Sequence, residues 1–230
     1  MKRFFGVLAP SDAGTRGAGT TLDAPARIER DGVIVALVGR PFWRGRPEAP
    51  ADEAMAGRIL DAFRERGSRV LEDLHGSFAL AILEPGERRA LLAIDRMGIQ
   101  RLAYRQTREG LCFSTSAEAV ARHASASPAV DLQAVFDYLF FHMVPSPRTL
   151  FAGVGKLPPA TCAEYADGRL TLRPYWNPTF VEDGPGDAPA LARELHESLR
   201  TGVLAAAPGS TSGAFLSGGL DSSTVAGVLT

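Results

Sequence analysis

The chain has 230 residues, 45% of them hydrophobic and 22% charged, and a formal net charge of −1 at pH 7. This composition is typical of a globular protein with one large core or two small ones, and the near-neutral charge excludes nucleic acid as the main partner. No apolar run reaches the roughly 20 residues that span a bilayer, and the first residues lack the apolar core of a signal peptide. We therefore expect a cytoplasmic protein with no membrane contact.

The first predicted strand covers residues 33–38, a continuous apolar run bounded by Gly32 and Gly39. A short apolar run rich in β-branched residues is typical of a buried strand. Residues 52–66 follow with the periodicity of an amphipathic helix, which we expect to end at Gly67. The apolar side chains of this helix share one face: Met55, Ile59, Leu60 and Phe63.

Apolar runs that follow one another in pairs predict three hairpins. Pro85 and Gly86 separate the first pair, and Asp167-Gly168 separates the last; all four residues favour tight turns. Stacked sheets with helices on the outside fit this order of elements. The paired runs are 77–83 with 89–94, 102–104 with 111–114, and 161–165 with 169–173.

A helix is predicted between the second and third hairpins, where Asp131 can cap the first turn and Pro145 lies beyond the end. Its apolar positions are Leu132, Val135, Phe136, Leu139 and Phe140. We interpret the aromatic residues of this region as core and interface material rather than as a cofactor site: Phe136, Tyr138, Phe140 and Phe141.

The segment 182–189, rich in proline, glycine and acidic residues, follows Asn177 and predicts a linker. Such a composition is typical of a boundary between domains. We place the first domain at 1–176, the linker at 177–190 and the second domain at 191–230.

The second domain is short. A short apolar strand is predicted at 213–216, and a helix is predicted to begin at Ser222. One strand and one helix cannot cover both faces of a parallel sheet, so we expect the truncated beginning of an α/β fold. An earlier helix carries four apolar positions on one face: Leu191, Leu195, Leu199 and Val203.

Residues 217–223 (SGGLDSS) join that strand to the last helix and carry the predicted chemistry. Two glycines let the backbone turn sharply and approach a ligand, and successive amides at a helix N-terminus form an anion site. The loop lacks the lysine of the phosphate-binding loop of kinases and GTPases. Asp221 alone would repel phosphate, so we expect it to hold Mg²⁺ that bridges to the phosphate oxygens.

A plainer interpretation of the same residues is a turn and a helix that Asp221 or Ser222 merely caps. The complete string directly after an apolar strand favours nucleotide binding instead. We predict that all seven residues bind ATP and its pyrophosphate: Ser217, Gly218, Gly219, Leu220, Asp221, Ser222 and Ser223.

The loop resembles the pyrophosphate-binding loop of the asparagine synthetase family, whose members activate a carboxylate as an acyl-adenylate. Further segments resemble that family in the same order along the chain: 74–83 (LHGSFALAIL), 91–104, 113–120, 144–160 and 173–178. The resemblance implies an α+β protein whose first domain is a class II glutamine amidotransferase domain, a four-layer αββα sandwich of the N-terminal-nucleophile hydrolase type. The first strand and helix of a truncated Rossmann-like synthetase domain would follow it.

The chain departs from the family's pattern at the glutaminase site. The family uses a cysteine at residue 2 as its nucleophile, whereas this chain has Lys2. Val38 replaces the asparagine that precedes the oxyanion glycine, so Gly39 lacks the neighbouring side-chain amide. Cys112 and Cys162 lie in predicted strands far from the N-terminus and are not expected to substitute. No catalytic residue is therefore predicted for glutamine hydrolysis.

The cysteines and histidines show no spacing of a disulfide framework, a zinc site or a redox motif. Free cysteine usually packs as a small apolar side chain, and we expect this of both cysteines. No metal site is predicted from the histidines, which are scattered: His75, His123, His142 and His196.

The implied reaction uses ATP and Mg²⁺. A small-molecule or peptide carboxylate is adenylated, and ammonia or an amine then forms the amide. Three alternatives stay open: an asparagine-synthetase-type ligase, an amide-forming relative of β-lactam synthetases and lasso-peptide cyclases, and a non-enzymatic sandwich module for binding or dimerisation. A homodimer is also left open. Because the family's other catalytic residues lie further downstream, we expect the 230-residue chain to be an inactive fragment of a longer protein.

Two further positions receive structural interpretations. Asp95 and Arg96 are expected to form an ion pair and a turn that brace the sandwich. Asp52 matches a position that binds the substrate amine in the family, yet we interpret it as the N-cap of its helix.

Overall fold

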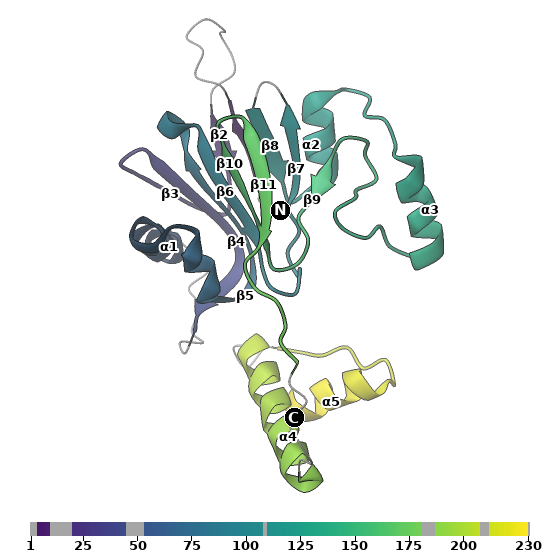
Figure 1. Cartoon of the computed structure of the whole chain (residues 1–230). Helices are drawn as coiled ribbons and strands as arrows, with labels where there is room; N and C mark the ends of the chain where they lie inside the picture. The colour runs from purple at the N-terminus through teal and green to yellow at the C-terminus, as the bar shows by residue number, and fades with distance from the viewer. Residues whose placement is uncertain are drawn as a thin grey trace, which may run out of the picture. The chain divides into compact units, whose positions relative to one another are not determined.

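The computed structural model describes residues 4–9, 20–44, 53–107, 110–180, 187–207 and 212–229. The chain forms two compact units, Met1–Asn177 and Pro178–Thr230 (Figure 1). Every strand in the described part of the chain belongs to the first unit.

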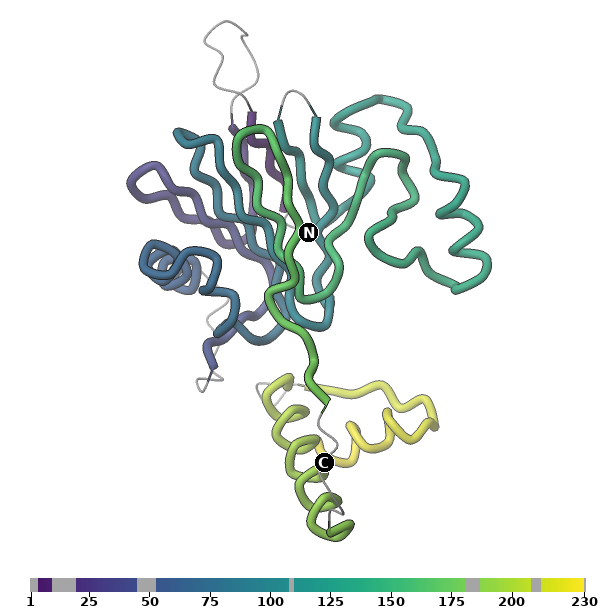
Figure 2. Tube along the Cα trace, in the orientation of Figure 1, coloured from purple at the N-terminus to yellow at the C-terminus, as the bar shows by residue number. Residues whose placement is uncertain are grey.

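Six of the described strands form one antiparallel sheet: β3 (Ala26–Arg30), β4 (Val33–Trp43), β5 (Leu74–Glu84), β6 (Arg89–Ile94), β10 (Thr161–Ala166) and β11 (Arg169–Pro174). They lie in the order β11-β10-β6-β5-β4-β3. The hairpin of β10 and β11 joins this sheet by pairing with β6, although about 70 residues separate them in sequence (Figure 2).

The other described strands form a second antiparallel sheet: β1 (Phe5–Leu8), β2 (Thr21–Asp23), β7 (Ala103–Thr107), β8 (Gly110–Ser114) and β9 (Gly155–Lys156). Their order is β2-β1-β8-β7-β9, so β1 lies beside β8 in the middle of the sheet. We call these two sheets the six-stranded and the five-stranded sheet.

Two helices cover the outer faces of the sheets (Figure 1). Helix α1 (Glu53–Arg66) packs on the six-stranded sheet, and α2 (Ala117–Ala124) packs on the five-stranded sheet. A third apolar cluster lies between the two sheets. The layers therefore follow the order helix, sheet, sheet, helix. The side chains of α1 that face its sheet are fully buried: Met55, Ala56, Ile59 and Leu60.

Small side chains on one sheet make room for large side chains from the other. The inner face of the six-stranded sheet carries many alanines: Ala36, Ala79, Ala81, Ala90 and Ala163. The five-stranded sheet and its edges contribute larger groups to the same cluster: Phe4, Leu8 and Phe113. Because both faces of β5 are buried, its sequence is a continuous apolar run rather than an alternating one.

The structure confirms the three predicted hairpins and the helix that ends at Gly67. The short helix η2 (Pro85–Glu87) turns β5 into β6. Asp167 and Gly168 have φ angles of 51° and 74°, as a tight two-residue turn between β10 and β11 requires. Two boundaries are wrong: the strand predicted to end at residue 38 continues to Trp43, and the helix predicted to begin at Ser222 begins at Leu220. Gly39 lies within β4 since a residue without a Cβ fits there at φ 102°.

The helix predicted after Asp131 is confirmed as α3 (Leu132–Phe141). The carboxylate of Asp131 accepts hydrogen bonds from the amides of Gln133 and Ala134, which is the expected N-cap. The prediction that the aromatic residues of this helix form core is wrong. Its aromatic side chains are all more than half exposed: Phe136, Tyr138, Phe140 and Phe141.

The second unit contains α4 (Ala188–Ala206) and α5 (Leu220–Leu229). Helix α4 begins inside the predicted linker, because a proline is well tolerated in the first turn of a helix. The strand predicted at 213–216 is wrong, and Phe215 is 97% exposed. A strand needs a hydrogen-bonded neighbour, and the described residues of this unit provide none. None of the described helices is long and apolar enough to cross a bilayer.

Candidate functional site

Residues 217–223 form a turn that leads into α5. Gly218 has a φ of 83°, which glycine adopts without strain. The amide of Ser217 donates to Oγ of Ser222 at 3.3 Å, and the two hydroxyl oxygens lie 3.0 Å apart. Ser222 donates its own hydroxyl to the carbonyl of Gly219 at 3.1 Å. The hydroxyls of Ser217 and Ser222 therefore close the turn.

The next amides of the turn are unpaired. The amides of residues 218–222 have no hydrogen-bond acceptor in the described part of the chain. The first helical hydrogen bond runs from the amide of Ser223 to the carbonyl of Gly219 at 3.1 Å. Unpaired amides at a helix N-terminus add to the positive end of the helix dipole, so this turn can bind an anion.

Asp221 is exposed in the first turn of α5. The described residues contain no group of three or more histidine, cysteine, aspartate or glutamate side chains that could hold a metal ion. A single exposed carboxylate of this kind is one of the oxygen ligands that Mg²⁺ accepts.

A pocket of about 710 Å³ lies between α4 and α5, and Asp221 and Ser222 line it. Its volume is in the range of small-molecule sites, roughly 300–1,000 Å³. Apolar side chains supply most of its other walls, among them Leu199, Val203, Phe215 and Val225. The turn thus combines polar groups for an anion with an adjoining apolar surface.

The residues that the sequence comparison with the glutaminase pattern singles out are only partly described by the structure. Lys2 and Asp52 lie outside the described residues, so their predicted roles are not tested. Val38 and Gly39 lie in β4, opposite Ala79 and Phe78 of β5. A pocket of about 820 Å³ lies beside the beginning of β1, and neither cysteine lines it. Its walls include Phe4, Phe5, Ser114, Ser116 and His123.

Both cysteines are buried in strands, which confirms that they pack as apolar residues. Burial raises the pKa of the Cys112 thiol to about 12. Burial also raises the pKa of Cys162, whose Sγ donates to the carbonyl of Arg173 at 3.4 Å. Thiols with raised pKa values stay protonated at neutral pH and are poor nucleophiles. Neither buried thiol is therefore a ready nucleophile.

Asp95 braces the sandwich, although not through the predicted partner. Arg96 donates from its guanidinium to the carbonyl of Glu72 at 2.8 Å and lies over the ring of Trp176 at 5.3 Å, so the predicted ion pair with Asp95 is wrong. The carboxylate of Asp95 is satisfied instead by four backbone amides, those of Phe78 at 3.3 Å, Met97 at 3.1 Å, Ile99 at 2.9 Å and Gln100 at 2.8 Å. The predicted turn is confirmed, and this carboxylate organises it.

Comparison with curated proteins finds asparagine synthetases. The chain is 26% identical over 174 residues to the glutamine-hydrolysing asparagine synthetase 3 of Bacillus subtilis, covering 74% of this chain and 28% of that protein. It is 27% identical over 172 residues to asparagine synthetase 1 of the same organism, covering 74% of this chain and 27% of that protein. The chain thus spans less than a third of the length of these relatives.

Two solved structures are similar at low identity. One is described as the allosteric regulatory enzyme of purine biosynthesis, with a TM-score of 0.39, 11% identity, and coverage of 70% of this chain and 32% of that one. The other is the glutamine phosphoribosylpyrophosphate amidotransferase of B. subtilis, with a TM-score of 0.30, 12% identity, and coverage of 66% and 32%. At these TM-scores neither likeness carries a conclusion.

The family model of the glutamine amidotransferase domain matches residues 54–176, more than half of the chain. This match covers α1, the hairpin of β5 and β6, and the remaining strands of both sheets that follow in sequence. The chain therefore belongs to the family of glutamine amidotransferase domains, and the relatives that it resembles are asparagine synthetases.

Proposed function

We propose that the turn at 217–223 binds the pyrophosphate part of ATP, and that the protein to which this chain belongs forms amide bonds through an activated carboxylate. The observation that carries the proposal is the row of unpaired amides at residues 218–222, in a segment whose sequence is SGGLDSS. A plain helix cap would leave such amides to water, whereas a phosphate can accept from several of them at once.

The residues fit a magnesium-bound phosphate better than a phosphate alone. Asp221 places a negative charge beside the amides, and this charge opposes the binding of a bare anion. Asp221 would hold a divalent cation, and the charge of that cation would offset the repulsion and polarise the phosphates. The hydroxyl of Ser223 has no hydrogen-bond partner among the described residues and is a further donor for the ligand.

In the proposed reaction a carboxylate oxygen attacks the α-phosphorus of ATP, and the bond to the bridging oxygen of pyrophosphate breaks. Ammonia or an amine then attacks the acyl carbon, loses a proton and displaces AMP. The amides at 218–222 would stabilise the negative charge that collects on the departing pyrophosphate. The second unit would belong to a Rossmann-like synthetase domain, with α5 as the helix that follows the phosphate loop.

The nitrogen source in this proposal is ammonia or an amine of the substrate rather than glutamine. Lys2 stands where the family's nucleophile would be, and burial keeps both cysteine thiols protonated. This observation favours, as a second candidate, an amide-forming enzyme whose substrate carries its own amine, as in relatives of β-lactam synthetases and lasso-peptide cyclases. Incubation with glutamine should release no glutamate, and a measurable release would remove this part of the proposal.

Nuclear magnetic resonance with magnesium pyrophosphate tests the site directly. We expect the amide signals of residues 218–222 to shift on titration, and MgATP to shift the same signals. Asp221→Asn should lower the magnesium-dependent affinity by about tenfold or more. Asp187→Asn is the matched control, because Asp187 precedes α4 in the same unit and its side chain caps nothing.

Two results would overturn the site. One is a titration in which the signals of 218–222 stay in place while pyrophosphate and magnesium are in excess. The other is an equal effect of Asp221→Asn and Asp187→Asn, which would assign the change to overall charge rather than to a specific ligand.

A further inference from the structure

Two buried nitrogen atoms of the first unit have no hydrogen-bond partner. They are Nε2 of His75 and Nε of Arg96, and no other buried side-chain nitrogen or oxygen of the residues that the structure describes is left in this way. Buried polar atoms in folded proteins are nearly always hydrogen-bonded, so each exception calls for an explanation such as a bound ion or water.

Both nitrogen atoms belong to residues around the beginning of β5, where it pairs with the end of β4 (Figure 1). Arg96 donates from its guanidinium to the carbonyl of Glu72 at 2.8 Å. The amide of Arg44 donates to the carbonyl of Asp73 at 2.9 Å, so the end of β4 lies beside the same segment. His75 follows two residues later. We call Arg44, His75 and Arg96 the basic cluster.

The positive charges of the basic cluster are not balanced by the described residues. Neither Arg44 nor Arg96 forms an ion pair with an acidic side chain of the described ranges, and the carboxylate of Asp73 is already paired with Arg66. Burial lowers the pKa of His75, and the charges of Arg96 and Arg44 lower it further, while Asp73 opposes them. The three basic groups are therefore close enough to repel one another.

Aromatic rings hold two members of the cluster by their faces. The ring of Phe42 is stacked on that of His75 with centroids 5.7 Å apart. The guanidinium carbon of Arg96 lies 5.3 Å from the centroid of the Trp176 ring. Hydrogen bonds to imidazole and guanidinium groups lie in the planes of those groups, so stacking fixes where Nε2 and Nε point without occupying them.

The chemistry of the cluster selects an oxyanion. A guanidinium group has only donors, so Nε of Arg96 requires an acceptor, and Nε2 of His75 donates when it carries a proton. A water molecule satisfies either nitrogen but leaves the charges of Arg44 and Arg96 unbalanced. A phosphate or a carboxylate supplies both the acceptor oxygens and the negative charge.

We propose that Arg44, His75 and Arg96 form a binding site for an oxyanion, the phosphate or carboxylate group of a small ligand. Arg96 and His75 donate to this group from Nε and Nε2, and Arg44 adds a positive charge from the end of β4. The proposal does not depend on the turn at 217–223, because the basic cluster lies in the first unit and that turn in the second.

Nuclear magnetic resonance of the 230-residue chain with inorganic phosphate or acetate tests this site, and sodium chloride at equal ionic strength is the reference. We expect the Nε–H signal of Arg96 and the ring signals of His75 to shift to a saturating value with the oxyanion and not with chloride. Tighter binding of phosphate assigns a phosphate group to the ligand, and tighter binding of acetate assigns a carboxylate. The pKa of His75 should rise in the bound state, because a bound anion favours the charged imidazole.

Arg44→Gln gives a variant with little risk to the fold, because Arg44 is exposed and its backbone amide is kept. The affinity for the oxyanion should fall by about tenfold, since one charged partner is lost. Arg89→Gln is the matched control. Arg89 is exposed at the beginning of β6, opposite Glu84 at the other end of β5, so this variant loses the same charge and should keep the affinity.

The proposal fails on any of three results. One is the absence of saturation with both phosphate and acetate, whether water or other residues of the chain satisfy the two nitrogens. Another is saturation that shifts neither Arg96 nor His75, which would place the anion elsewhere. The third is an equal loss of affinity in Arg44→Gln and Arg89→Gln, which would assign binding to overall charge.

Discussion

A single buried carboxylate fixes the turn between β6 and β7. Asp95 is 1% exposed and accepts hydrogen bonds from four amides, while its own carbonyl accepts from the amides of Gly98 and Ala160. Hydrogen bonds to a charged acceptor are stronger than neutral ones, and buried donors without an acceptor are costly. Asp95 therefore stabilises the junction of three chain segments.

The Asp95→Asn variant should lower the free energy of unfolding of the first unit by about 2–4 kcal/mol, because its amide group cannot accept the bonds that one carboxylate oxygen accepts. Urea unfolding followed by tryptophan fluorescence measures this, since Trp43 and Trp176 both lie in the first unit. Asp167→Asn is the matched control: Asp167 lies in a turn at φ 51°, which asparagine adopts readily, so stability should change by less than about 0.5 kcal/mol. Equal effects of the two variants would contradict the role given to Asp95.

His75 is a second residue whose surroundings determine its charge. Its Nε2 is buried and has no hydrogen-bond partner in the described part of the chain. Burial lowers the pKa of His75, and the positive charges of Arg96 and Arg44 lower it further, while Asp73 opposes them. The folded chain therefore favours neutral His75.

This lowered pKa predicts a loss of stability in acid. Unfolded His75 takes up a proton near its ordinary pKa of 6.5, whereas the folded chain takes it up only at lower pH. The contribution of neutral His75 to the free energy of unfolding is thus fully present above about pH 6.5, and it is lost as the pH falls through the lowered pKa. Urea unfolding at about pH 7 and about pH 5 should show a smaller acid-side loss for His75→Gln than for the wild type. His123→Gln keeps His75 and should keep the full loss; an equal loss in all three proteins would refute the explanation.

At the scale of elements, β4 and β5 approach each other closely at two glycines. A Cβ at Gly39 would lie 2.2 Å from the carbonyl oxygen of Ser77, and a Cβ at Gly76 would lie 2.3 Å from that of Arg40. Both glycines have positive φ, 102° and 80°. Because both glycines lack a Cβ, the backbones of β4 and β5 can approach closely here, and the two strands stay paired as far as Trp43 and Leu74.

Gly39→Ala should therefore destabilise the first unit by about 3 kcal/mol or more, since the methyl group meets backbone and the φ angle is strained. Gly57→Ala is the matched control within α1, where the new Cβ would meet nothing closer than 3.8 Å. That substitution should stabilise the helix by about 0.5–1 kcal/mol. Urea unfolding measures both, and a destabilisation by Gly57→Ala as large as that by Gly39→Ala would contradict the argument.

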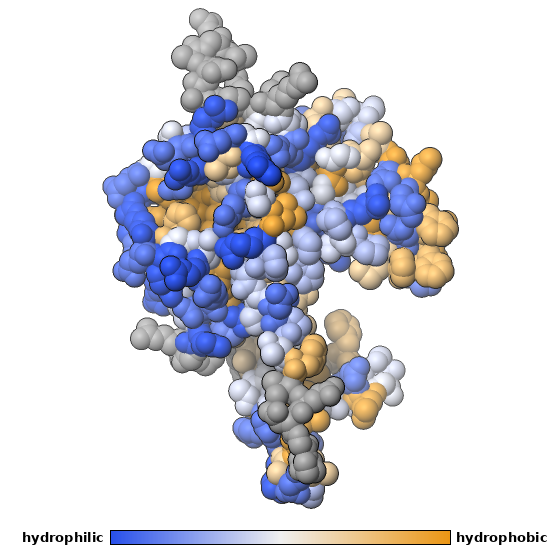
Figure 3. Space-filling view, viewed as in Figure 1, coloured by the Kyte–Doolittle hydropathy of each residue, from blue (hydrophilic) through white to orange (hydrophobic). Residues whose placement is uncertain are grey.

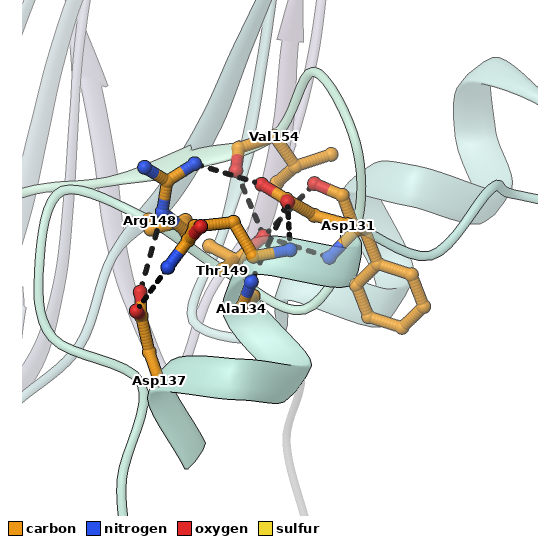
Figure 4. A network of polar contacts seen from close by, with 8 residues as sticks. Asp131, Ala134, Asp137, Arg148, Thr149 and Val154 are labelled. Atoms are coloured by element: carbon orange, nitrogen blue, oxygen red, sulfur yellow. Dashed lines mark hydrogen bonds and ion pairs between the residues drawn. The ribbon is translucent and has the colours of Figure 1, made fainter. Parts of the chain in front are cut away.

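The elements that sequence reasoning predicts correctly are those fixed by local chemistry. Turn residues mark the hairpins, and periodicity marks α1 and α3. The role of Gly39 depends on β5, a strand about 40 residues away in sequence. From the sequence alone, this glycine is equally compatible with the end of a strand and with a place where two strands approach closely. The periodicity of α3 shows which residues form its apolar face, but not whether that face points to the core or, as in the structure, to solvent (Figure 3). The orientation depends on Arg148, which lies outside the helix and forms ion pairs with Asp131 and Asp137 (Figure 4).

At the scale of the whole chain, the two units differ in how much they bury. The described residues of the first unit form three apolar clusters, two on the outer faces of its sheets and one between them. Helices α4 and α5 of the second unit contain no buried residue among those described. The turn at 217–223 could be predicted from its own residues. The strand predicted before it does not form, because a strand needs paired neighbours and no local pattern shows whether they are there.

This difference predicts that the units lose structure separately. Backbone amides open locally with a free energy that falls as burial and contacts fall, so hydrogen exchange should be slow in β5 and β6 and fast throughout α4 and α5. Brief proteolysis should accordingly remove α4 and α5 while leaving the sheets of the first unit intact.

Magnesium pyrophosphate should slow the exchange of α5 if the turn at 217–223 binds it, because a ligand that binds only the folded form stabilises that form. Exchange in α4 and α5 as slow as in β5, without any ligand, would mean that the second unit is held by more than the contacts described for its two helices.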